Sequence, residues 1–67
     1  MTTLSAGIIV IGNEILSGRT QDTNSNFIAK NLIESGINLE KIIVIQDIEK
    51  IIIDNVIDFS EKYSYVF

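Results

Sequence analysis

Two short, nearly continuous runs of apolar and mostly β-branched residues constrain the fold of this chain most strongly. They cover residues 6–11 (AGIIVI) and 39–46 (LEKIIVIQ), and Gly12 ends the first run. An apolar run without polar alternation is typical of a strand that is covered on both faces. Such strands occur in parallel sheets, where the connection between neighbouring strands usually contains a helix. The two runs therefore predict neighbouring strands of a parallel sheet.

The segment between these runs has the pattern of an amphipathic helix over residues 24–35. Asn24 or Ser25 can cap its N-terminus, and Gly36 suits the left-handed residue that often follows a helix. Apolar residues recur there at steps of three and four: Phe27, Ile28, Leu32 and Ile33.

A second helix is predicted over residues 48–62, directly after Asp47, which would be a good N-cap. Its apolar positions also recur at helical spacing: Ile52, Val56, Phe59 and Tyr63. Residues 64–67 then begin a third apolar run. Aromatic side chains at helical spacing are expected in the core rather than in a stacking role: Phe27, Phe59 and Tyr63.

This order of elements predicts an α/β fold with a parallel sheet and right-handed crossovers. Ligands of such sheets bind at the carboxyl ends of the strands. The loop that begins at Gly12, the turn at Asp47 and whatever follows Phe67 are therefore expected at one edge of the sheet. Because so short a chain can bury only a small core, we expect residues 1–67 to be the N-terminal part of a single larger domain. The C-terminal remainder is then missing, and this part is expected to be inactive alone.

Composition excludes several classes of function. The chain has no cysteine and no histidine, which excludes a disulfide framework and a Cys/His zinc site. Oxygen ligands remain, and they suit magnesium or another hard divalent cation. The net charge is −4 and the five basic residues are scattered, so we expect no nucleic-acid partner. No apolar run is long enough for a membrane span and the first residues lack the charge of a signal peptide, so we expect a cytoplasmic protein.

The stretch GNEILSGRTQDTNSNFIAKNL, residues 12–32, is a candidate site because strand-to-helix connections usually take only about 2 to 6 residues. Gly12 and Gly18 are too far apart for the P-loop motif, and the dinucleotide pattern G-x-G-x-x-G is absent. A polar loop that begins at a glycine and leads to a helix N-terminus can nevertheless offer backbone N–H groups to an anion. Phosphate binding therefore stays open.

The stretch IIVIGNEILSGRTQDTNSNFIAKNLIESGI resembles the opening of the molybdenum-cofactor biosynthesis domain shared by MoaB, Mog, MoeA and gephyrin. The resemblance is closest to the branch in competence/damage-inducible protein A (CinA) and in stand-alone molybdopterin-binding proteins. Its most specific part is G-N-E-I-L-S-G-x-x-x-D-T-N-S, and VIQDIEKI and YSYVF follow in the family's order and spacing. The resemblance implies a three-layer α/β/α fold, of which this chain has the first β-α-β-α-β portion. It also implies a homo-trimer that holds the phosphate-bearing end of molybdopterin or a nucleotide at the sheet's carboxyl edge.

The resemblance further implies roles for single residues. Asp47 matches an acidic residue implicated in magnesium-dependent chemistry in adenylyl-transferring members, so it is the predicted catalytic and metal-binding residue. Gln46 departs from a glycine often found before that aspartate. The residues that match the first signature loop are predicted to bind the ligand: Gly12, Asn13, Glu14, Ser17, Gly18, Asp22, Asn24 and Ser25.

These residues also have structural alternatives. Asp47 could simply cap a helix, and residues 22–25 could order the entry to the first helix through side-chain-to-backbone hydrogen bonds. Gly12 and Gly18 could serve backbone geometry alone. Arg19 fits a solvated side chain or an ion pair better than a phosphate clamp, because one arginine is not a cluster.

Three functions stay open for the complete protein. The first is binding of a phosphate-bearing ligand, with pterin and nucleotide not separated by the sequence. The second is metal-dependent hydrolysis of ADP-ribose-type nucleotide pyrophosphates, which the CinA branch includes, with Asp47 as the acidic participant. The third is a trimer-forming assembly or scaffold unit.

Overall fold

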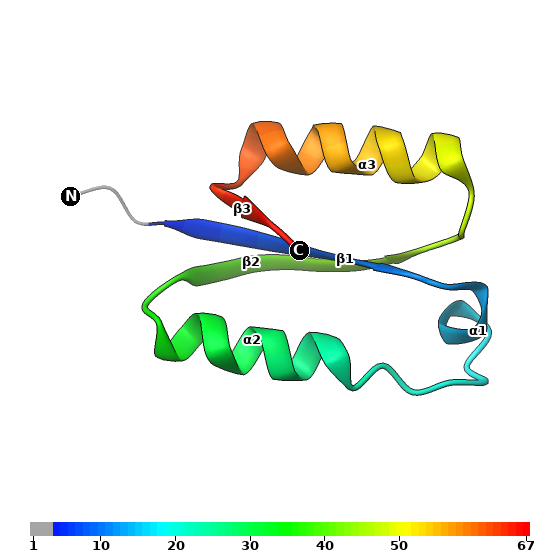
Figure 1. Ribbon diagram of the computed structural model, residues 1–67, viewed down its shortest axis with the longest axis horizontal. Helices are drawn as coiled ribbons and strands as arrows, with labels where there is room; N and C mark the ends of the chain where they lie inside the picture. Colours follow the sequence, from blue (N-terminus) through cyan, green and yellow to red (C-terminus); the bar gives the residue numbers. More distant parts are fainter. Residues whose placement is uncertain (1–3) are drawn as a thin grey trace.

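The computed structural model describes residues 4–67, which form a three-stranded sheet with helices on both faces (Figure 1). The predicted alternation of strands and helices is confirmed, and the structure adds one short helix, α1, that the sequence pattern does not predict. No helix within these residues is long and apolar enough to cross a membrane. In chain order the elements are β1 (Ser5–Ile11), α1 (Asn13–Leu16), α2 (Asn24–Glu34), β2 (Asn38–Ile45), α3 (Glu49–Lys62) and β3 (Tyr65–Val66).

The sheet is parallel, with the strand order β2-β1-β3, so the predicted parallel α/β fold is confirmed. In the β1–β2 register, Ile8 lies opposite Ile42. Pairing with β1 extends one residue past β3, because the Phe67 N–H donates to the Gly7 carbonyl at 3.0 Å and the Ile9 N–H donates to the Phe67 carbonyl at 2.7 Å. The central strand β1 therefore has neighbours on both sides, and α2 and α3 lie on opposite faces of the sheet (Figure 1).

The main cluster of buried apolar side chains lies between α2 and the sheet. The expectation that Phe27 belongs to the core is wrong, because its side chain is 70% exposed. One residue along a helix turns the side-chain direction by about 100°. The rotation that points Ile28 and Leu32 at the sheet therefore carries Phe27 to the side of the helix. The buried residues of the cluster are Ala6, Ile8 and Leu32, and the partly buried ones are Val10, Ile28, Ile37 and Leu39.

On the other face, α3 packs on β1 through aromatic side chains, as predicted. Phe59 is 1% exposed and Tyr63 is half-buried, with their rings edge to face at a centroid distance of 5.1 Å. A Cβ atom at Gly7 would lie only 2.5 Å from Cδ2 of Phe59. The absence of a side chain at Gly7 therefore sets how closely α3 approaches the sheet.

The helix ends confirm one prediction and correct another. Gly36 adopts a left-handed conformation (φ 79°) after α2, as expected. The expectation that Asp47 caps α3 is wrong, because α3 begins at Glu49 and Ile48, in extended conformation, precedes it without a side-chain capping bond. The reason is a tight turn, in which the Ile48 N–H donates to the Gln46 carbonyl at 2.9 Å and Asp47 is the central residue.

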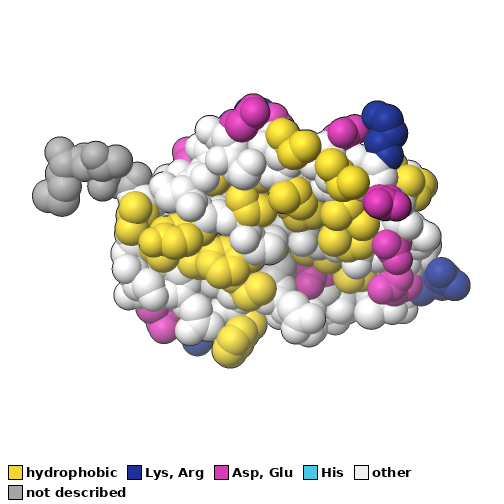
Figure 2. Space-filling model, turned by 45° about the horizontal axis from the view of Figure 1, so that its top comes forward, with side chains coloured by type: hydrophobic (Ala, Val, Ile, Leu, Met, Phe, Trp, Pro, Cys, Tyr) yellow, Lys and Arg dark blue, Asp and Glu magenta, His cyan; other side chains and the backbone are white. Residues whose placement is uncertain are grey.

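Large apolar side chains also reach the surface. Figure 2 shows hydrophobic side chains exposed on the side of the molecule that carries α3. Exposed apolar patches commonly mark interaction surfaces. The exposed large residues of α3 are Ile53, Val56 and Ile57.

Candidate functional site

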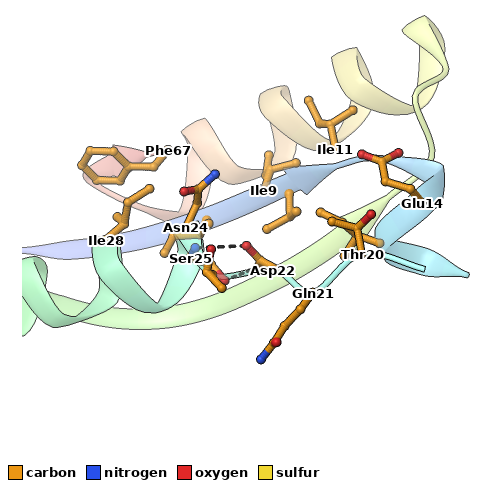
Figure 3. A pocket seen from close by; sticks show the side chains of 14 residues that line it. Ile9, Ile11, Glu14, Thr20, Gln21, Asp22, Asn24, Ser25, Ile28 and Phe67 are labelled. Atoms are coloured by element: carbon orange, nitrogen blue, oxygen red, sulfur yellow. Dashed lines mark hydrogen bonds between the residues drawn. The ribbon is translucent and has the colours of Figure 1, made fainter. Parts of the chain in front are cut away.

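A cleft of about 510 Å³ opens at the carboxyl end of β1 (Figure 3). Its apolar lining comes from β1 and from Ile15, Ile28 and Phe67. Its polar lining comes from Glu14 and residues 20–23, in the long connection between β1 and α2, and from Asn24 and Ser25 in the first turn of α2. Small-molecule sites of proteins commonly measure about 300–1,000 Å³ and combine an apolar lining with a few polar groups. The cleft has the size and composition of such a site.

The helix α1, a single turn, carries Glu14 to the end of β1. Gly12, just before α1, is buried, and its N–H donates to the Ile45 carbonyl at 3.1 Å. A Cβ atom at Gly12 would lie 2.7 Å from Oε1 of Glu14. The Glu14 carboxylate therefore folds back over the glycine, and a larger residue at position 12 would displace it from the mouth of the cleft.

A turn around Gly18 returns the chain from α1 toward the cleft. Gly18 adopts a left-handed conformation (φ 79°), and nothing lies within 4 Å of a Cβ atom placed there. This position therefore favours glycine for its backbone conformation and not for lack of space. The Glu14 carbonyl accepts hydrogen bonds from the N–H groups of Arg19 (2.9 Å) and Thr20 (3.1 Å). The Ser17 hydroxyl accepts from Nε of Arg19 at 3.1 Å. These contacts shape the connection.

Asp22 caps α2 from just outside the helix. Its Oδ1 accepts from the Ser25 N–H at 3.2 Å, and its Oδ2 accepts from the Ser25 hydroxyl. These two hydrogen bonds, the hydroxyl first, hold the pKa of Asp22 below its ordinary value of 3.8. The expectation that Asn24 or Ser25 caps the helix is wrong, because the N-cap residue is Thr23 and the carboxylate of Asp22 accepts the Ser25 N–H instead. The side-chain-to-backbone bond expected of residues 22–25 is present between Asp22 and Ser25, and ligand contact by these residues stays a prediction.

Asp47 lies at the same edge of the sheet but does not line the cleft. Its N–H donates to Oδ1 of Asn13 at 3.4 Å, which joins the turn after β2 to the start of α1. The expectation that these two connections meet at one edge is thus confirmed. Asp47 itself is exposed.

The structure brings only part of the predicted ligand-binding set into the cleft. The predicted residues that line it are Glu14, Asp22, Asn24 and Ser25. Those that do not are Gly12, Asn13, Ser17 and Gly18. The sequence prediction does not include three polar lining residues, Thr20, Gln21 and Thr23. Thr20 and Gln21 occupy variable positions of the signature, and Thr23 lies between Asp22 and Asn24, whose side chains offer more hydrogen-bonding groups. Phe67 was missed because the strand that places it beside β1 is short.

For the predicted divalent cation, the donor set is incomplete. Within residues 4–67, no three His, Cys, Asp or Glu side chains come together. Glu14 and Asp22 are the carboxylates that line the cleft. Magnesium is commonly held by one or two carboxylates together with waters and substrate phosphates. The cleft therefore fits such a cation only when the ligand supplies phosphate oxygens.

Relatives of known name cover most of this chain. It is 47% identical over 62 residues (92% of the chain) to a probable FAD synthase of Caenorhabditis briggsae. It is 48% identical over 62 residues (92% of the chain) to a probable FAD synthase of Caenorhabditis elegans. It is 48% identical over 44 residues (66% of the chain) to a CinA-like protein of Sulfurihydrogenibium sp. strain YO3AOP1. The chain spans only 12% of the length of each FAD synthase and 11% of the CinA-like protein.

A family model described as a probable molybdopterin binding domain matches residues 7–67. This match runs from β1 to the last residue and includes every element that lines the cleft. The chain therefore belongs to the family of probable molybdopterin-binding domains.

Proposed function

We propose that the cleft at the carboxyl end of β1 binds a phosphate-bearing ligand, either molybdopterin or a nucleotide. The observation that carries this proposal is the cleft itself, which is lined by the signature loop of a molybdopterin-binding domain. Its apolar lining suits the flat ring of either ligand, and its hydroxyl, amide and carboxylate groups suit the ring's polar edge.

Asn24 and Asn26 provide a matched test. Both lie in the first turn of α2 and are exposed, but only Asn24 lines the cleft. In the full-length protein, Asn24→Ala should weaken binding of guanosine monophosphate and of pterin by about fivefold, the worth of one hydrogen bond. Asn26→Ala should leave binding unchanged. Calorimetric titration measures both, and equal affinities of the two variants would contradict this location of the site.

The second candidate is metal-dependent hydrolysis of nucleotide pyrophosphates by the full-length protein. Its support is the similarity to proteins named FAD synthase, whose product is a dinucleotide with a pyrophosphate bridge. Asp47 is the proposed acidic residue, and a divalent cation would polarise the phosphate and activate water. Asp47→Asn should abolish magnesium-dependent hydrolysis of ADP-ribose, while Glu49→Gln, at a nearby exposed residue, should not. Full turnover by Asp47→Asn would remove Asp47 from the mechanism.

Assembly as a cytoplasmic homo-trimer is the third candidate, and the exposed apolar side chains of α3 support an interface there. Ile57 is 53% exposed, so Ile57→Lys should lower the mass measured by light scattering without unfolding the protein. Lys50→Ala, on the same helix, serves as the control. An unchanged mass of the Ile57→Lys variant would exclude α3 from the interface.

A further inference from the structure

Two serines join the start of β1 to the residue just before β3 by a reciprocal pair of hydrogen bonds. The Ser5 N–H donates to Oγ of Ser64 at 3.3 Å, and the Ser64 N–H donates to Oγ of Ser5 at 3.2 Å. The two residues are 59 positions apart in the sequence and meet where β3 enters the sheet beside β1 (Figure 1). We call this pair the serine clasp.

The serine clasp marks one register of β3 against β1. Gly7 lies opposite Val66 in this part of the sheet. Two residues earlier in each segment stand Ser5 and Ser64. A slip of β3 by two residues would keep its side chains on the same faces of the sheet, but it would separate both hydroxyl groups from their N–H partners. The two hydrogen bonds therefore form together only in the observed register.

The register of β3 matters for the cleft because this strand leads into Phe67. The Phe67 N–H donates to the Gly7 carbonyl at 3.0 Å, and the Ile9 N–H donates to the Phe67 carbonyl at 2.7 Å. These bonds hold Phe67 beside β1, where it lines the cleft together with Ile28 (Figure 3). In another register, a different residue would occupy this place in the wall.

We infer that Ser5 and Ser64 are positioning residues for the ligand site. Their hydroxyl groups fix the register of β3, and the register places the ring of Phe67 in the cleft wall. Neither serine lines the cleft, so both act through Phe67. An aromatic ring in the wall can stack on the flat heterocycle of a ligand, and this contact depends on where the ring stands. The inference rests on the proposed function and adds two residues that contact no ligand.

The test is a double-mutant cycle on the full-length protein, with the affinity for pterin measured by calorimetric titration. Phe67→Ala should weaken binding by about tenfold, as loss of one stacking contact does. Ser5→Ala/Ser64→Ala should weaken it by about threefold, within the range of one neutral hydrogen bond. Because the serines act through Phe67, the same two substitutions should have no further effect in the Phe67→Ala background.

Two control variants and one further measurement separate positioning from a general loss of hydroxyl groups. Ser5→Thr/Ser64→Thr keeps both acceptors and should retain the affinity of the unmodified protein. Ser60→Ala removes a hydroxyl that donates to the Ile57 carbonyl within α3, and it should leave the affinity unchanged. Without ligand, amide hydrogen exchange at Phe67 should become about tenfold faster in Ser5→Ala/Ser64→Ala, because two hydrogen bonds that hold this segment are lost.

Three results would overturn the inference while the proposed function stands. They are an unchanged pterin affinity of the alanine double variant, unchanged exchange at Phe67, and an equal loss of affinity in the Phe67→Ala background. In the last case the serines would act by a route other than Phe67. If the unmodified protein binds neither pterin nor guanosine monophosphate, the proposed function fails and the inference fails with it.

Discussion

The connection after β1 and the turn after β2 leave the sheet at the same edge, yet they are built differently. The first occupies residues 12–23 and contains α1, a left-handed turn and the carboxylate that caps α2. The second occupies residues 46–48 and contains one tight turn. The first lines the cleft at the end of β1 and the second does not, and the hydrogen bond from the Asp47 N–H to Asn13 joins the two. A connection at the carboxyl edge of the sheet therefore forms a binding site only if it is long enough to build one wall of a cleft.

The largest effect is expected from a change of backbone conformation in the long connection. Gly18→Val forces a β-branched residue into the left-handed region and should lower the free energy of unfolding by about 1–3 kcal/mol. Gly36→Val, at the same φ on the opposite edge of the sheet, should lower it by a similar amount. Only Gly18→Val should also abolish ligand binding, as denaturant unfolding and titration can measure. Loss of binding in both variants would mean that the long connection has no special role.

A smaller loss of stability is expected from removal of the helix cap. Asp22→Ala leaves the Ser25 N–H without its acceptor, whereas Asp22→Asn keeps an oxygen acceptor of the same length. Because the folded-state pKa of Asp22 lies below 3.8, its ionised form stabilises the fold above that pH, and the contribution is lost as pH falls through the lowered pKa. The stability difference between the unmodified protein and Asp22→Ala should therefore disappear in strong acid. A difference that persists there would contradict the role of the ionised carboxylate.

A still smaller effect is expected where the two connections touch. Asn13→Ala removes the acceptor of the Asp47 N–H, at a long 3.4 Å, and should change the free energy of unfolding by only about 0.5 kcal/mol. Amide hydrogen exchange at Asp47 should nevertheless become faster. Asn13→Asp keeps the acceptor and should protect this amide as the unmodified protein does.

The smallest effect is expected from the short turn. Asp47→Ala should change the free energy of unfolding by less than about 0.5 kcal/mol, the range for surface positions without a special role. The reason is that α3 begins at Glu49 and receives no cap from Asp47. A loss of stability as large as that of Asp22→Ala would mean that Asp47 does cap α3, as the sequence predicts. The two connections would then not differ in how they support the following helix.

Periodicity sufficed for the strands and the two long helices, because burial on the sheet imposes it. It missed α1, which is one turn of four residues with no buried side chain and so has no apolar pattern. It misplaced Phe27, because four apolar residues at helical spacing do not determine which of them faces the sheet. Residue type alone also misassigned Asp47, which could equally be an N-cap or the centre of a tight turn. Half of the predicted ligand-binding set lines the cleft: Glu14, Asp22, Asn24 and Ser25. The sequence could not separate these residues from the others, because the path of the whole connection decides which side chains reach the cleft.

The most direct test of the central claim is to follow backbone amide signals of the full-length protein by NMR during titration with pterin. The account predicts that the amides of Glu14, Asp22 and Asn24 shift in proportion to occupancy, while that of Asn26 stays fixed. It also predicts at most a small shift at Asp47, transmitted through Asn13. Large shifts confined to the turn at residues 46–48, with Glu14 and Asp22 unchanged, would contradict the assignment of the ligand to the cleft at the end of β1.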